Sequence, residues 1–164
     1  MSEADQLIKQ GKFGDALARA QKVTDELPYH ESELDKARTL SATIATEARK
    51  RQELVETLVS DAVFLENPQK FGEAEKAAHE AMDAFSGSPS LDTFKALLEK
   101  AATEKTRFDA ERRSLEAERL YRMAASLCTR ADRKATGELI ARYIVLHLGD
   151  TPSADKAKQL APGP

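Results

Sequence analysis

Two long stretches of the sequence, residues 31–65 and 90–130, contain neither Gly nor Pro. Because these two residues most disfavour a helix interior, each stretch can form a helix much longer than the average of about 11–12 residues. In the first stretch, apolar residues recur in steps of three and four from Leu34 to Leu65, with Ser41 and Arg51 as polar exceptions. The chain is therefore predicted to be all-α, with long helices that need neighbouring helices along their length.

Gly and Pro residues mark the turns between these long helices and several shorter ones. Gly11 and Gly14 flank Phe13, Pro68 follows a break in the apolar pattern, and residues 86–89 form a Ser, Gly and Pro-rich loop. The pattern predicts helices at about 2–10, 13–27, 31–65, 70–85, 90–130 and 132–148, and a weak helix at 153–161, with Pro28 ending the second. The 31–65 stretch is either one helix or two joined by a kink, since the charged run at 47–53 crosses its middle.

The segment GKFGDALARAQKV, which begins at Gly11, is repeated as QKFGEAEKAAHEA from Gln69. Both copies contain Lys, Phe, Gly, an acidic residue and Ala in succession, and Phe13 and Phe71 are 58 positions apart. A third, weaker copy is predicted with Ile140 opposite Ala74, at an offset of 66. Internal repeats of this kind indicate that one supersecondary unit recurs along the chain.

The first copy resembles the second half of a tetratricopeptide repeat, in which Gly and an aromatic residue precede a helix with a small contact residue and a terminal Pro. The matching positions are Lys9, Gln10, Gly11, Phe13, Ala16, Leu17, Val23 and Pro28. The 58-residue spacing is longer than the 34-residue period of that family. The central part is also similar to a microtubule-interacting-and-transport domain, a three-helix relative, at Asp61, Ala62, Val63, Phe71, Glu73, Ala74 and Ala81.

The helix lengths predict the domain organisation. A helix of about 15 residues can pair with only half of a helix of about 35, so each long helix is expected to serve two successive bundles. This gives three units at 1–48, 49–108 and 109–164, the last with the weak helix and a tail; one continuous domain is the alternative. The expected fold is an elongated helical repeat of tetratricopeptide-like hairpins, or of small three-helix bundles, linked by long helices.

No catalytic, cofactor or metal site is expected. His30, His79 and His147 lie far apart, and the sequence has no HExxH motif and no cysteine pair. The phosphate-binding GxxxxGK and GxGxxG loops and the GxSxG nucleophile elbow do not occur either. Cys128, the single cysteine, is expected to be a small packed residue on a helix. These observations argue against an enzyme.

The resemblance to tetratricopeptide repeats implies that another protein is bound in a groove. The positions that would face it are Val59 and Val63 in the second copy, together with Val55, and Ala125 and Thr129 in the third. These side chains suit an apolar or helical ligand rather than a carboxylate tail. The alternative interpretation is that the valines belong to the core.

Charge and hydropathy limit the possible partners. Charged residues make up 32% of the chain with a net charge of −3, which describes a solvated surface and gives no reason to expect nucleic acid. Arg49, Lys50 and Arg51 form a candidate anionic docking site, with a solvated helix face as the alternative. The N-terminal residues lack the features of a secretion signal, and no apolar run is long enough for a transmembrane segment. A cytoplasmic location is therefore expected, and a piece of a larger protein would have the same features.

Two functions remain open. The first is a non-enzymatic adaptor or scaffold that binds another protein through helical repeats. The second is a structural rod, or a self-associating coiled coil that forms a homodimer through the apolar stripe from Leu34 to Leu65.

Overall fold

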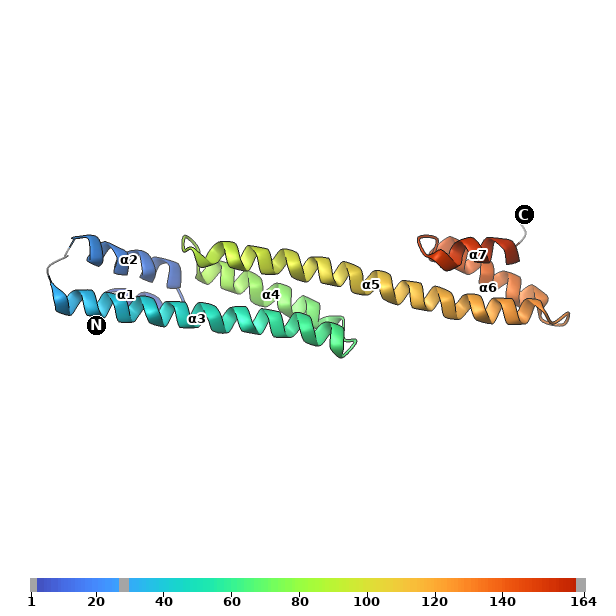
Figure 1. Ribbon diagram of the computed structural model, residues 1–164, viewed down its shortest axis with the longest axis horizontal. Coiled ribbons are helices and arrows are strands. Elements are labelled where there is room, and N and C mark those ends of the chain that lie inside the picture. The colour runs from blue at the N-terminus through green and yellow to red at the C-terminus, as the bar shows by residue number, and fades with distance from the viewer. Residues whose placement is uncertain (1–2, 27–29, 162–164) are drawn as a thin grey trace. The chain divides into compact units, whose positions relative to one another are not determined.

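The computed structural model describes residues 3–26 and 30–161, and among these it has seven α-helices and no strand (Figure 1). The helices are α1 (Glu3–Lys9), α2 (Phe13–Glu26), α3 (Glu31–Phe64), α4 (Gln69–Ala84), α5 (Ser90–Cys128), α6 (Lys134–His147) and α7 (Pro152–Leu160). The all-α prediction is confirmed, and the bounds lie within about two residues of those expected from the Gly and Pro punctuation. Pro28, the predicted stop of the second helix, lies outside the described residues.

The chain divides into two compact units, residues 1–105 and 106–164. This differs from the three predicted units, since residues on both sides of the predicted boundary at 48 belong to the first unit. α3 continues without a break through that boundary. The second predicted boundary, at residue 108, lies close to the observed division. The charged run at 47–53 therefore interrupts the apolar stripe of α3 without interrupting the helix.

In the first unit, α2 and α4 both pack against α3 (Figure 1). Ala37 and Ile44 are buried in the N-terminal half of α3, and Val55, Val59 and Ala62 in its C-terminal half. No residue of α3 between Ile44 and Val55 is buried. The N-terminal and C-terminal halves of α3 thus each have their own buried residues, as its length predicts. A polar segment of α3 separates the two halves.

Aromatic rings from the start of α2, the end of α4 and the start of α5 pack against one another. The ring of Phe13, at the start of α2, stacks on that of Phe85 at a centroid distance of 4.9 Å, and Phe85 lies 5.4 Å from Phe94. The guanidinium of Arg51 lies 5.3 Å from the centre of the Phe13 ring, and its Nε is 3.4 Å from an oxygen of Glu47. Arg51 is a polar exception in the apolar stripe because it covers an aromatic ring there.

The second unit has a core of small and aliphatic side chains. The buried hydrophobic residues that cluster in this core are Ala117, Ala124, Ala141, Ile144, Leu148, Ala154 and Ala157. α6 packs against α7, and Gly137 brings α6 so close to α5 that an added Cβ would lie 2.6 Å from Sγ of Cys128. Cys128 is half-buried at this helix contact.

The turns after α4 and α6 correct the register of the third repeat. Ser88 Oγ donates a hydrogen bond to the carbonyl of Phe85 at 2.8 Å, and Thr151 Oγ1 donates one to Leu148 at 2.7 Å. These two turns are 63 positions apart, and both are followed directly by Pro. At this offset the buried residues also coincide, since Ala74, Ala78 and Ala81 correspond to Gly137, Ala141 and Ile144. The predicted offset of 66, with Ile140 opposite Ala74, is therefore wrong.

Candidate functional site

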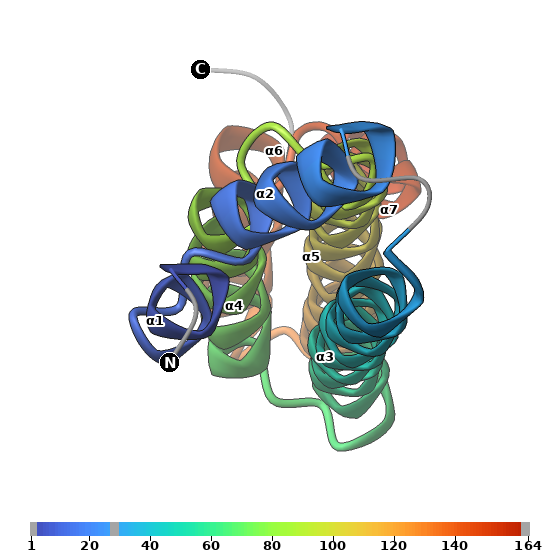
Figure 2. The ribbon, with the colours of Figure 1, turned by 90° about the vertical axis from the view of Figure 1, so that its left-hand side faces the viewer.

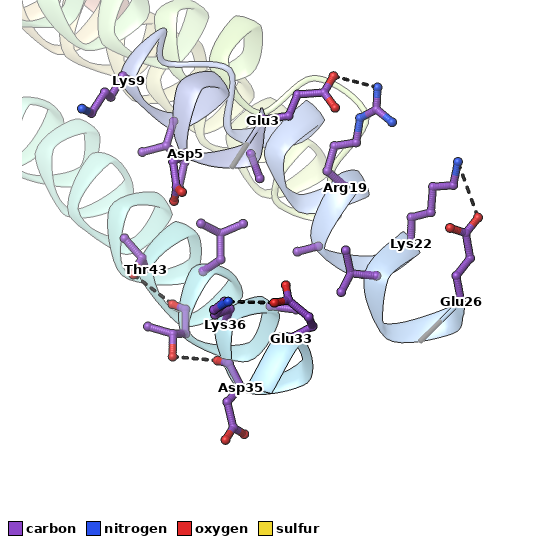
Figure 3. A pocket seen from close by; sticks show the side chains of 17 residues that line it. Glu3, Asp5, Lys9, Arg19, Lys22, Glu26, Glu33, Asp35, Lys36 and Thr43 are labelled. Atoms are coloured by element: carbon purple, nitrogen blue, oxygen red, sulfur yellow. Dashed lines mark hydrogen bonds and ion pairs between the residues drawn. The ribbon is translucent and has the colours of Figure 1, made fainter. Parts of the chain in front are cut away.

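The first three helices enclose an open groove of about 970 Å³ (Figure 3). α1 and α3 both pack against α2, and in Figure 2 they lie on the same side of it. The groove is consequently bounded by α1 and α3, with α2 between them. All its lining residues belong to the first unit, so that one compact body contains the whole groove.

Apolar side chains from all three helices line the groove. Ala20 and Ala37 are buried at its base, whereas Ile8, Val23 and Leu40 remain half-buried. α1 contains no buried residue. The groove therefore offers partly exposed aliphatic surface on three sides, which suits the apolar face of an amphipathic helix.

Charged residues of both signs surround this apolar surface (Figure 3). Arg19 on α2 donates a hydrogen bond to Glu3 on α1 at 3.0 Å, and this ion pair links the two helices. Along α3, Lys36 pairs with Glu33 at 2.7 Å. Because these pairs are largely exposed, each adds little to stability.

The five residues predicted to bind a partner differ in burial and do not lie in one unit. Val55 is fully buried and Val59 is 8% exposed, so both are core residues and cannot line an open groove. Val63 is 45% exposed near the end of α3. Ala125 is half-buried and Thr129 is exposed in the second unit. For Val55 and Val59 the core alternative applies, because α4 covers this face of α3.

The three cations predicted to dock an anion do not form one patch. Successive residues on an α-helix point about 100° apart, so Arg49, Lys50 and Arg51 face different directions. Arg51 turns to Phe13, and both Lys50 and Arg51 approach Glu47, at 3.8 Å and 3.4 Å. This arrangement favours the solvated-face interpretation.

The residues of the groove itself were not singled out from the sequence. Leu40 stands beside the three-four stripe of α3 rather than in it, and α1 is too short for a clear apolar period. The available signal was the pair Ala4 and Ile8, which are four residues apart and therefore share one face of the first helix.

The described residues contain no group of three or more His, Cys, Asp or Glu side chains arranged to hold a metal ion. A hydrogen bond from Lys158 lowers the pKa of Asp155, and a hydrogen bond to Glu73 raises the pKa of Lys70. Asp155 is exposed and Lys70 is half-buried, and each belongs to an i,i+3 pair on a helix surface. They have the features of helix-surface pairs rather than of catalytic groups held in a cleft.

No family model matches the chain, and no curated protein or solved structure matches it. The resemblances to tetratricopeptide repeats and to the microtubule-interacting-and-transport domain therefore stay predictions. Within residues 3–26 and 30–161, no helix has both the length and the apolar character needed to cross a bilayer.

Proposed function

We propose that this chain is a non-enzymatic adaptor that binds another protein by accepting an amphipathic helix in the groove of α1, α2 and α3. The observation that carries the proposal is the convergence of half-buried aliphatic side chains from three helices, Ile8, Val23 and Leu40, inside a charged rim. A helix needs apolar anchors at spacings of three and four residues, and a groove between two helices presents such anchor points on both walls.

The tetratricopeptide resemblance of residues 9–28 falls on the first two helices, although the partner positions that it implies lie elsewhere, on α3 and at the end of α5. It predicted a helical hairpin whose small residue permits close approach, and Ala16 is fully buried in α2. The proposed binding surface moves from the valines of α3 to the first three helices, because Val55 and Val59 lie in the core.

Site-specific photo-crosslinking tests the proposal. A benzophenone amino acid is placed at Leu40 in the groove and, as a matched control, at Leu54, which is 51% exposed outside it. In extracts of the native source, we expect one polypeptide to crosslink at Leu40 and not at Leu54. Introducing Val23→Asp should reduce this crosslink about tenfold or more, since a carboxylate would then be desolvated by the bound helix.

The structure also bears on the alternative function. The apolar stripe from Leu34 to Leu65, which a self-associating coiled coil would use, contains residues buried against α2 and α4. A second copy could reach those buried residues only by displacing the two helices. Crosslinking that joins Leu40 only to a second copy of this chain would support the rod and overturn the adaptor; equal crosslinking at Leu40 and Leu54 would also contradict the groove.

A further inference from the structure

The outer face of α6 carries a row of exposed apolar side chains. Leu139 is 70% exposed, Tyr143 is 46% and Leu146 is 78%. Their spacing of four and three residues places them on one side of the helix, opposite the buried face that contains Ala141 and Ile144. α6 is therefore apolar on two sides, although only one of them packs into the core of its unit.

The two other helices at the same place in the repeat lack this row. At an offset of 63, the outer positions Leu139, Arg142, Tyr143 and Leu146 correspond on α4 to Lys76, His79, Glu80 and Asp83. A further offset of 58 leads to Ala18, Gln21, Lys22 and Asp25 on α2. All eight of these residues are exposed. Since seven of the eight are polar or charged and the other is Ala18, the fold does not require the row of large apolar side chains on α6.

We propose that this face binds α6 of a second copy of the chain, with the two helices antiparallel. The charge pattern selects this occupant. Glu138 and Arg142 are four residues apart and lie on the same flank of the apolar row. In an antiparallel pair related by a two-fold axis, equal flanks face each other. With the axis near residue 140, Glu138 faces Arg142 of the second copy, and the reciprocal pair forms on the other side of the axis.

The remaining side chains fit the same register. Leu139 lies across the axis from Leu139 of the second copy. In this register Leu146 packs against Ala135 of the second copy, which places a large side chain opposite a small one. Tyr143 lies beside Thr136 of the second copy, on the flank opposite the charges. Ala135 and Thr136 are both exposed and therefore accessible to such a neighbour.

Within residues 3–26 and 30–161, the charge of Arg142 has no partner. Among the described residues no acidic side chain forms an ion pair with it, and Glu138 reaches only Lys134, at 3.9 Å. One face of a 14-residue helix gives an interface at the small end of the range for stable complexes. The dimer is accordingly weak and reversible, and it involves residues of the second unit only, so it does not rest on the groove of the first.

Sedimentation velocity of the full chain over a wide concentration range tests the proposal. The unmodified chain should show a reversible monomer–dimer equilibrium. Leu139→Glu places two carboxylates on either side of the axis and should raise the dissociation constant by about tenfold or more. Leu115→Glu is the matched control, since Leu115 is 67% exposed on α5 of the same unit, and it should leave the constant unchanged. Circular dichroism checks that both variants keep their helix content.

A charge exchange identifies the occupant and its direction. Arg142→Glu alone and Glu138→Arg alone each set like charges against each other, and each should weaken the dimer about tenfold. The double variant restores both cross-pairs and should return the dissociation constant to within about threefold of the original. A chain that remains monomeric at the highest soluble concentration would overturn the proposal, as would a double variant no tighter than the single ones.

Discussion

Replacing Gly14 by Ala should destabilise the first unit, although the same change at Gly72 should stabilise it. The two glycines are 58 positions apart and occupy the same place in the repeat, near the start of α2 and of α4. A Cβ on Gly14 would lie 1.9 Å from the carbonyl oxygen of Ser86 and 2.9 Å from its carbonyl carbon. A Cβ on Gly72 would meet nothing within 4 Å. The pair therefore separates the effect of close packing from that of helix propensity.

The size of the effect follows from these contacts. The Ser86 carbonyl belongs to the backbone, so the turn after α4 must move by about 1 Å or more to restore van der Waals contact. Overpacking of this kind costs about 1–3 kcal/mol, and disturbing the stack of Phe13 on Phe85 costs about 0.5–1.5 kcal/mol more. Helix propensity returns at most about 1 kcal/mol. We expect a net loss of about 2 kcal/mol for Gly14→Ala and a gain of about 0.5–1 kcal/mol for Gly72→Ala.

Urea unfolding followed by circular dichroism measures both changes in the full chain. Hydrogen exchange at the amides of α2 localises the Gly14→Ala effect, because loss of the contact with Ser86 should raise exchange there first. If Gly14→Ala and Gly72→Ala change the free energy of unfolding by the same amount, the close approach of α2 to the turn at Ser86 is not present in solution, and the reasoning fails.

Two further predictions concern single side chains. Arg51→Met should lower the free energy of unfolding by about 0.5–1 kcal/mol in urea titrations, since it loses the cation–π contact with Phe13, whereas Arg49→Met should change it little. The carboxyl of Asp155 should titrate below its ordinary pKa by NMR, because Lys158 donates a hydrogen bond to the charged form, and Lys158→Met should move the midpoint back up. With a lowered folded-state pKa, this pair stabilises α7 above the ordinary carboxyl pKa, and its contribution is lost as the pH falls through the lowered value; an unchanged midpoint in Lys158→Met would contradict the assignment.

The sequence by itself determined the helices. Gly, Pro and the 3.6-residue apolar period act through local backbone preferences, so the bounds of α3 and α5 could be predicted closely. The repeat of Phe13 at Phe71 also fixed which short helices are equivalent. Even the interruption at Arg51 was visible as a break in the stripe of α3, although its reason, the Phe13 ring beneath it, was not.

Only the tertiary structure decided which apolar faces are covered. Val59 and Leu40 look alike as apolar residues of one helix, yet α4 buries the first and the short α1 leaves the second in an open groove. The register of the third repeat likewise depended on burial, since Gly137, Ala141 and Ile144 are the positions of α6 that pack into the core as Ala74, Ala78 and Ala81 do in α4. The physical reason is that the hydrophobic effect is non-directional, so an apolar side chain gains free energy from burial against any apolar neighbour. Whether it becomes core or binding surface depends on which helix packs beside it, and the sequence of its own segment does not encode that.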